Sequence, residues 1–384
     1  MAGSKSRRGG SETLLFSGCV RLALVWAALL LTGMSCSPSR PAAPEQPWKE
    51  WPVPAAVERL ATSGQLLTAL CTDDQLRVWR WEALDLPPTL RRVEPWERPG
   101  FAIGRFGRAA AVLEGGQVLT ALAQPRGGSC GIALLDAEGV EITRWDFGNE
   151  WEECQKIQNS KTGQYALVWL RENFTNVLKD RSRRDDGDYR LGVVPAGGGQ
   201  VKWLPPIRVH RDSGGFFGAN LSDDGRFVAG VGCWNDGWAV VGDVEKAEIL
   251  WNKVVHGPEV TVPSKPWTVN FNDCAFSPDG SRLYVAGNTG LFCFDVQTGK
   301  ILQQWGSEGR LMSVEASPDG RWVATGMAMP GDVFLYDLQT NSLARRIRTG
   351  DLAVWVTFSL DSQLLATSGG DNSNSNIKIW KLTP

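Results

Sequence analysis

The chain contains few residues of the kinds that carry out acid–base or nucleophilic chemistry. Only two histidines occur, His210 and His256, and no Gly-x-Ser-x-Gly sequence lies near them. A catalytic base needs a partner within hydrogen-bond reach that orients it and tunes its pKa. Asp185, Asp186 and Asp188 lie close together but lack the alternating acids and distal Glu of a calcium loop. The sequence therefore predicts no enzyme, no metal site and no cofactor.

Aromatic and cationic residues are plentiful instead, with 18 Trp and 40 Lys plus Arg. Trp and Arg dominate binding hot spots because each combines a large contact area with a polar group. Several occur in or beside the long connections expected at residues 171–188, 205–215 and 255–269. The candidate partner-binding residues are Trp151, Arg208, His210, Phe216, Trp234, Trp267 and Arg310. Solvated charged loops and Trp packed between strands are the alternative interpretations.

A short repeat defines the elements that would position these residues. Residues 270–305 contain four apolar runs closed by turn residues, and residues 312–348 repeat the pattern. Alternating apolar residues indicate strands, and Pro-Asp-Gly between two runs indicates a tight turn with Gly at positive φ. Four strands in about 40 residues is the period of a propeller blade.

Seven such units can be counted from their turns. In each unit a turn separates the first strand from the second. From the first unit to the seventh, these turns lie at residues 63–64, 115–116, 161–163, 223–225, 278–280, 318–320 and 360–362. The third strands are expected at residues 76–81, 131–135, 189–194, 238–244, 291–296, 333–338 and 377–382. The predicted fold is an all-β, seven-bladed propeller of four-stranded antiparallel blades over residues 48–384.

The repeats resemble those of WD40 proteins and their bacterial relatives. The similarity lies in the Ser-Pro-Asp-Gly turns and in third strands that end in an aromatic residue and Asp, as at Phe294-Asp295 and Tyr336-Asp337, with Trp380-Lys381 in the last unit. The Gly-His pair of that family is absent before most units. The resemblance implies a scaffold that binds a protein or peptide.

The last unit has no room for a fourth strand, because the chain ends four residues after Trp380. An unpaired third strand would leave a row of backbone donors and acceptors exposed. We expect residues 48–53 to supply the missing strand, so that the N-terminal segment completes the C-terminal blade.

Six cysteines follow Cys19 and Cys36. No Cys-x-x-Cys occurs, which argues against zinc, iron–sulfur and haem sites. Disulfides are possible in an exported chain, and Cys130 with Cys154, at the same end of neighbouring units, is the most favoured pair. The others are expected as buried thiols in or beside strands. They are Cys71, Cys233, Cys274 and Cys293.

The first 35 residues are predicted to be a signal peptide. Basic residues, Lys5, Arg7 and Arg8, precede an apolar run over residues 22–34 that is too short to span a bilayer. Gly33-Met34-Ser35-Cys36 resembles the lipobox of bacterial lipoproteins, which implies that Cys36 is acylated and anchors the chain. Plain secretion, including to the periplasm, and an uncleaved anchor are the alternatives. Residues 36–47, rich in Pro and Ser, would form a linker.

The net charge excludes a nucleic-acid partner. It is −2 for the whole chain, and residues 1–36 are net positive, so the remainder is more acidic still. We therefore expect a monomeric scaffold at the cell envelope that contacts the membrane only through its anchor. The alternative is a propeller enzyme, because residues 295–305 and 243–251 resemble repeats of quinoprotein dehydrogenases and of YVTN-type propellers, which include lactonases.

Overall fold

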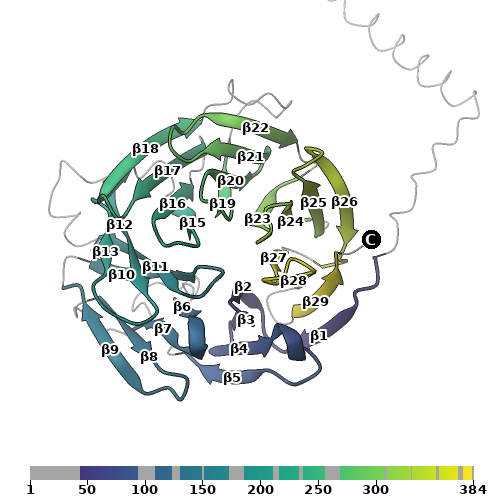
Figure 1. Ribbon diagram of the computed structural model, residues 1–384, viewed down its shortest axis with the longest axis horizontal. Coiled ribbons are helices and arrows are strands. Elements are labelled where there is room, and N and C mark those ends of the chain that lie inside the picture. The colour runs from purple at the N-terminus through teal and green to yellow at the C-terminus, as the bar shows by residue number, and fades with distance from the viewer. Residues whose placement is uncertain are drawn as a thin grey trace, which may run out of the picture. The chain divides into compact units, whose positions relative to one another are not determined.

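The computed structural model describes residues 44–93, 109–122, 130–148, 151–172, 186–210, 216–232, 237–255, 269–306, 309–329, 331–351, 354–370 and 375–382. Their strands form seven antiparallel sheets, arranged as blades around one axis (Figure 1). In six blades the first strand in the chain lies nearest the axis and the later strands follow outward, and in the remaining blade the strand nearest the axis is β27 (Trp355–Phe358) (Figure 1). This arrangement confirms the prediction of an all-β propeller with seven blades.

Blades 1 and 2 each include a short 3-10 helix. In blade 1, η1 follows the third strand, and in blade 2, η2 forms the turn between the first two strands. Blade 1 consists of β2 (Val57–Ser63), β3 (Leu66–Cys71), β4 (Gln75–Arg80), η1 (Trp81–Ala83) and β5 (Thr89–Arg92). Blade 2 consists of β6 (Ala110–Val112), η2 (Glu114–Gly116), β7 (Val118–Ala121), β8 (Gly131–Leu135) and β9 (Glu141–Asp146).

Blade 3 differs from the predicted four strands, because its outer position is divided between two short strands. Both pair with the third strand, and Pro205 and Pro206 separate them. Proline has no N–H to donate, so the outer ladder is interrupted there. The strands are β10 (Trp151–Asn159), β11 (Tyr165–Glu172), β12 (Asp186–Pro195), β13 (Lys202–Trp203) and β14 (Ile207–His210).

Blades 4, 5 and 6 follow the predicted plan, and their third strands lie within one residue of the expected ranges. Blade 4 consists of β15 (Phe216–Leu221), β16 (Phe227–Gly232), β17 (Gly237–Asp243) and β18 (Glu248–Val255). Blade 5 consists of β19 (Phe271–Phe276), β20 (Arg282–Gly287), β21 (Gly290–Asp295) and β22 (Ile301–Gly306). Blade 6 consists of β23 (Leu311–Ala316), β24 (Trp322–Met327), β25 (Asp332–Asp337) and β26 (Ser342–Arg348).

Blade 7 combines strands from the two ends of the described chain. It contains β27 (Trp355–Phe358), β28 (Leu364–Gly370) and β29 (Ser375–Lys381), and its outer strand is β1 (Lys49–Val53). β1 pairs antiparallel with β29, with Lys49 opposite Ile379 and Val53 opposite Ser375. In Figure 1, β1 accordingly lies at the outer side of β29.

Ser-x-Asp-Gly turns connect the first and second strands of several blades. In blade 5, Ser277 Oγ donates to Asp279 Oδ1 at 2.5 Å, and the N–H of Arg282 donates to Ser277 Oγ at 3.0 Å. Gly280 adopts φ +67°, which a residue without Cβ accepts at low cost. Ser222, Ser317 and Ser359 make the same contacts in their blades. These turns fix where each innermost strand ends.

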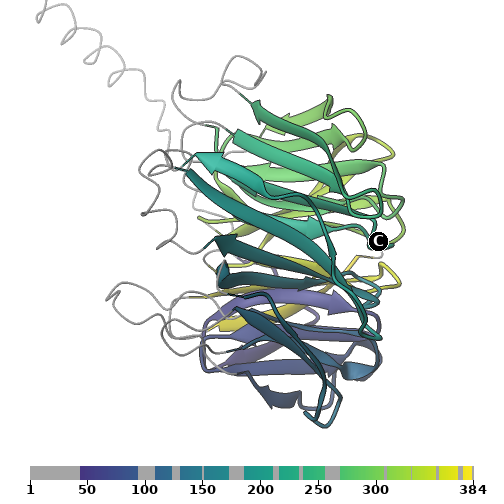
Figure 2. The ribbon, with the colours of Figure 1, turned by 90° about the vertical axis from the view of Figure 1, so that its left-hand side faces the viewer.

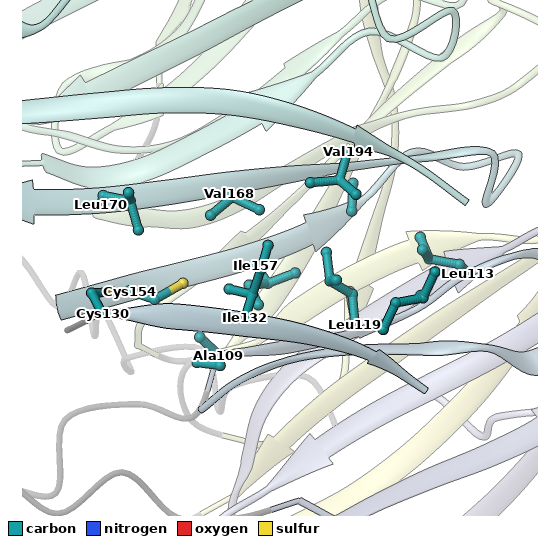
Figure 3. Close-up of a cluster of buried hydrophobic side chains, with 14 of the residues drawn as sticks. Ala109, Leu113, Leu119, Cys130, Ile132, Cys154, Ile157, Val168, Leu170 and Val194 are labelled. Carbon is teal, nitrogen blue, oxygen red and sulfur yellow. The ribbon is translucent and has the colours of Figure 1, made fainter. Parts of the chain in front are cut away.

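The hydrophobic core consists of layers between neighbouring blades. Figure 3 shows the layer between blades 2 and 3, where Leu119 and Ile132 of one blade face Ile157 and Val168 of the other. Because neighbouring blades cover both faces of a blade, strands such as β16 and β17 are buried along their whole length. Among the described residues, we find no helix with the length and hydropathy needed to cross a bilayer.

Cys130 and Cys154 occupy the same layer, at one end of blades 2 and 3 (Figure 3). The sequence-based prediction of their proximity is correct. The disulfide that the sequence permits between them, however, is not present: both residues carry buried thiols. Cys71, Cys274 and Cys293 are also buried thiols, as expected, and Cys233 lies outside the described residues.

Candidate functional site

The innermost strands surround the axis of the ring, which Figure 1 shows along the axis and Figure 2 shows from the side. The surface that these strands turn toward the axis is called the central channel below. A cavity of about 30 Å³ lies in it and draws its lining from six innermost strands and the turns that follow them. Polar and charged side chains predominate there. The polar lining residues are Arg59, Thr62, Gln158, Asn159, Lys161, Asn220, Asp223, Ser277, Glu315 and Thr357.

One level of the channel wall carries three charged side chains from different blades. Arg59 of β2, Lys156 of β10 and Asp273 of β19 each come directly after a register shift in the pairing of their strand. A β-bulge of this kind re-aims the following side chain and increases the local twist. Gly218 and Ser313 follow the same shift in blades 4 and 6. This level, called the axial ring below, therefore comprises Arg59, Lys156, Gly218, Asp273 and Ser313.

The axial ring holds two cations and one anion in a partly desolvated setting. Burial, and then repulsion from Arg59, lowers the pKa of Lys156 to about 8. Burial raises the pKa of the Asp273 carboxyl, against the attraction of both cations. The carboxylate accepts a hydrogen bond from the N–H of Val314 at 3.2 Å. Arg59 stays charged at neutral pH, because a guanidinium does not lose its proton in this range.

A second set of charges crosses the channel nearer the Ser-x-Asp-Gly turns. Lys161, in the turn after β10, reaches from blade 3 to blade 6, where its Nζ lies 2.8 Å from Glu315 Oε1 and also donates to the carbonyl of Ala316. The N–H of Lys161 donates to Asp223 Oδ1 of blade 4 at 2.9 Å. Burial raises the pKa of Glu315, and the ion pair with Lys161 opposes that shift. This bridge spans the channel between blades that are not neighbours.

Arg310 lies at the other end of the channel wall, directly before β23. Its Nε and Nη2 donate to Asn272 Oδ1 of blade 5 at 3.2 and 2.7 Å. Asn272 Nδ2 in turn donates to the carbonyl of Leu311 at 2.6 Å. The guanidinium is exposed but held in one orientation, which lowers the entropy lost when it contacts a partner.

The structure gathers the described candidate residues at the same end of the blades. Trp151 and Phe216 begin the innermost strands β10 and β15, and Arg310 precedes β23. Arg208 and His210 lie on strand β14 rather than in the expected loop, because residues 207–210 pair with residues 186–189 of β12. This pairing corrects the boundaries of the expected connections at residues 171–188 and 205–215.

Exposure distinguishes these candidates. Trp151 is only 7% exposed and packs in the layer between blades 2 and 3, so little of its ring is available to a partner. Arg208 is exposed, and its Nε lies 3.1 Å from Asp188 Oδ1. The side chains of His210 and Phe216, and all of Trp234 and Trp267, fall outside what the structure describes. Their role in binding remains a prediction, as does that of Arg310 and Arg208.

Sequence reasoning missed the charged wall of the channel. Lys156 and Asp273 each stand four residues before the serine that begins the turn of their blade. A charged residue four positions before that serine was the signal that could have revealed them. Among the described residues, we find no group of three or more His, Cys, Asp or Glu side chains that could hold a metal ion.

Comparison with solved structures supports the fold. The chain superposes on a chain of the crystal structure of the mitotic checkpoint complex with a TM-score of 0.62, covering 90% of this chain and 98% of that one at 13% identity. That similarity concerns the fold alone. Together with the strand topology, it defines a seven-bladed β-propeller. No protein-family profile matches the sequence.

Similarity to characterised sequences covers short segments. The chain is 35% identical over 92 residues to the U3 small nucleolar RNA-associated protein 21 homolog of Schizosaccharomyces pombe, which is 24% of this chain and 10% of that protein. It is 24% identical over 123 residues to GID complex subunit 7 of the same yeast, 29% of this chain and 24% of the relative. It is 32% identical over 77 residues to dihydro-heme d1 dehydrogenase of Pseudomonas aeruginosa, 20% of this chain and 16% of the enzyme. The matches thus span less than a quarter of each relative.

Proposed function

We propose that the chain is a non-catalytic scaffold that binds a protein or peptide at the end of the ring where Arg310 lies. The observation that supports this proposal is the position of the Arg310 guanidinium beside the channel. Asn272 holds it through hydrogen bonds across the junction of blades 5 and 6. A preorganised, exposed Arg on rigid strands is suited to a binding hot spot.

Two of the similar proteins support an interaction role. One relative is named as a subunit of the GID complex, and the structural neighbour comes from the mitotic checkpoint complex. Both names describe proteins within assemblies. The partner of this chain need not be related to theirs, because a propeller presents different residues on the same framework.

Affinity capture with matched variants tests the proposal. Arg310→Ala and Arg208→Ala each remove an exposed cation from the proposed end, whereas Arg144→Ala removes an exposed, ion-paired cation from the outer strand of blade 2. We expect the wild-type chain and Arg144→Ala to recover one common partner from membranes of the cells that make this protein, and Arg310→Ala to lose it. Equal recovery by all the variants would reject this end as the binding surface.

We further propose that the scaffold is exported and anchored through Cys36, with plain secretion as the alternative. The support is sequence alone: the basic residues, the apolar run over residues 22–34 and the small residues before Cys36. Mass spectrometry of the mature N-terminal peptide tests it, because acylation adds lipid mass that simple cleavage does not. Cys36→Ser should abolish the added mass and release the protein from membranes.

A propeller enzyme is the second candidate, and the match to 77 residues of dihydro-heme d1 dehydrogenase is the observation that favours it. The scaffold proposal predicts a colourless purified protein with no lactone hydrolysis. A bound chromophore, or lactone hydrolysis that chelators suppress, would favour the enzyme instead.

A further inference from the structure

We propose that the axial ring binds a carboxylate group between Arg59 and Lys156. This site lies inside the channel and is separate from the partner surface at Arg310, so it can bind a free carboxylate even if the scaffold proposal is wrong. It can also receive an acidic side chain or the terminal carboxylate of a peptide that enters the channel.

The first support is a pair of cations without partners. Among the described residues, no hydrogen bond or ion pair reaches Lys156 Nζ or the guanidinium of Arg59, although Asp273 attracts both electrostatically. Arg59 Nε is shielded from solvent and has no acceptor in the described part of the chain. A shielded charged donor without an acceptor costs free energy that an anionic ligand would recover.

The second support is the strand geometry that brings the two cations to one level. Each follows a bulge at the same place in its blade, with Arg59 opposite Leu70 and Lys156 opposite Trp169. The inner strands β2 and β10 contact each other, and Asn159 Nδ2 donates to the carbonyl of Thr62 at 2.6 Å. The short innermost strand of blade 2 therefore leaves blades 1 and 3 in direct contact beside the axis.

Charge and size favour a carboxylate over a larger or more highly charged anion. Arg59 and Lys156 carry two positive charges, Asp273 carries one negative charge, and Glu315 also attracts Arg59, so the axial ring is net positive by one at most when Asp273 is ionised. A phosphate dianion would exceed that charge and face Asp273. The cavity of about 30 Å³ that Arg59 lines together with Glu315 and Asp223 corresponds to roughly two water-sized positions. Lys156 does not line this cavity, so it limits the size of the ligand on the Arg59 side only. The planar guanidinium also matches a carboxylate in geometry.

The titration of Lys156 supplies a direct reporter of occupancy. Its pKa is lowered to about 8 by burial and by repulsion from Arg59, while Asp273 and Cys274 oppose the shift. A carboxylate beside Lys156 favours the charged ammonium and raises this pKa. Binding and protonation are linked, so affinity for the carboxylate falls as pH rises above about 8.

Nuclear magnetic resonance of the full chain labelled with [13C]lysine tests the inference. The Lys156 signal is assigned by its loss in Lys156→Met, and its pKa is measured in sodium acetate and in sodium chloride at equal ionic strength. We expect acetate to raise the pKa of Lys156 by at least half a unit relative to chloride. In Arg59→Gln the acetate effect should disappear, whereas in Arg144→Gln it should persist.

Further measurements identify the source of the carboxylate. A short peptide with one Glu is compared with its Gln analogue, both with blocked ends, and its effect on Lys156 is read in the same way. An effect of acetate alone supports a free small carboxylate, and an effect of the Glu peptide alone supports a peptide side chain. Equal pKa values of Lys156 in acetate, chloride and both peptides would overturn the inference.

If Arg59→Gln does not fold, Arg59→Lys replaces it in the test. This variant keeps the positive charge but loses the planar guanidinium, so it should weaken the effect of acetate on the pKa of Lys156. An undiminished effect of acetate would also overturn the inference.

Discussion

Lys161 of blade 3 and Glu315 of blade 6 join opposite sides of the ring, with Nζ 2.8 Å from Oε1. The pair is largely buried, since the two side chains are 13% and 16% exposed. Most polar contacts in a propeller link a blade to its neighbour, whereas this one crosses the axis. The ion pair therefore resists displacement of blade 3 relative to blade 6, although these two blades do not pack against each other.

Breaking this bridge should destabilise the ring. Lys161→Met leaves Glu315 partly buried without its cation, so we expect a loss of about 1–3 kcal/mol in the free energy of unfolding. A double-mutant cycle with Glu315→Gln, followed by chemical denaturation, measures the coupling between the two side chains. Additive effects of the two substitutions would show that the bridge contributes nothing beyond each residue alone.

Replacing Lys156 should stabilise the chain at neutral pH. Its folded pKa of about 8 lies below the ordinary value of 10.5, so between these values the unfolded chain binds more protons. Stability therefore rises with pH across this window, and below it the charged lysine carries its full cost. We expect Lys156→Met to raise the free energy of unfolding at pH 7 by on the order of 1–3 kcal/mol and to flatten its rise between pH 8 and 10.5. Denaturation in carboxylate-free buffer measures both.

Lys300→Met is the control for that prediction, because Lys300 is exposed in the turn after β21. It should leave the pH dependence unchanged. A wild-type chain whose stability is flat from pH 8 to 10.5 would contradict the lowered pKa of Lys156.

Deleting residues 47–54 should lower the melting temperature by several degrees or more. The deletion removes β1 and the hydrogen bond from the N–H of Trp48 to the carbonyl of Ile379 at 2.8 Å, and leaves β29 unpaired on one side. Differential scanning calorimetry checks this, with deletion of residues 1–43 as the control. If the two truncated proteins melt at the same temperature, the N-terminal strand does not help to hold the ring together.

Gly326→Ala should be strongly destabilising although the substitution is small. Gly326 lies on β24, and a Cβ there would overlap the carbonyl oxygen of Val354 in blade 7 and crowd Ser313 Oγ. Overpacking of this kind costs about 1–3 kcal/mol, and backbone atoms cannot rotate away. Gly197→Ala is the matched control, because nothing lies within 4 Å of a Cβ at that position. Similar unfolding midpoints for the two variants would contradict the close approach of blades 6 and 7.

The sequence predicted the number of blades because each one carries its own local signals. Alternating apolar residues and turns such as Ser277 to Gly280 are read within one repeat, and packing between blades reinforces them. The division of the outer strand in blade 3 escaped prediction, although Pro205 and Pro206 could have indicated it.

The site was less predictable, because its members come from different repeats. Arg59, Lys156 and Asp273 are separated by roughly one hundred residues at each step, and only the common register of the bulged strands brings them to one level. Trp151 shows the opposite difficulty. A Trp at the start of a strand is compatible with a binding surface and with a packing layer. Whether Trp151 is exposed or buried depends on how blade 2 packs against it, and the sequence around Trp151 does not show this.

The pairing of β1 with β29 has a consequence for proteolysis and assembly. After a cut between β1 and β2, only the backbone hydrogen bonds to β29 and side-chain contacts would hold β1 in place. The strand could then dissociate. A clipped chain that lost it would expose the edge of β29 and could accept the same strand from an intact neighbour. Because the strand of an intact neighbour stays joined to its own ring, this donation would link the two molecules, so keeping the short connection between β1 and β2 intact protects the monomer.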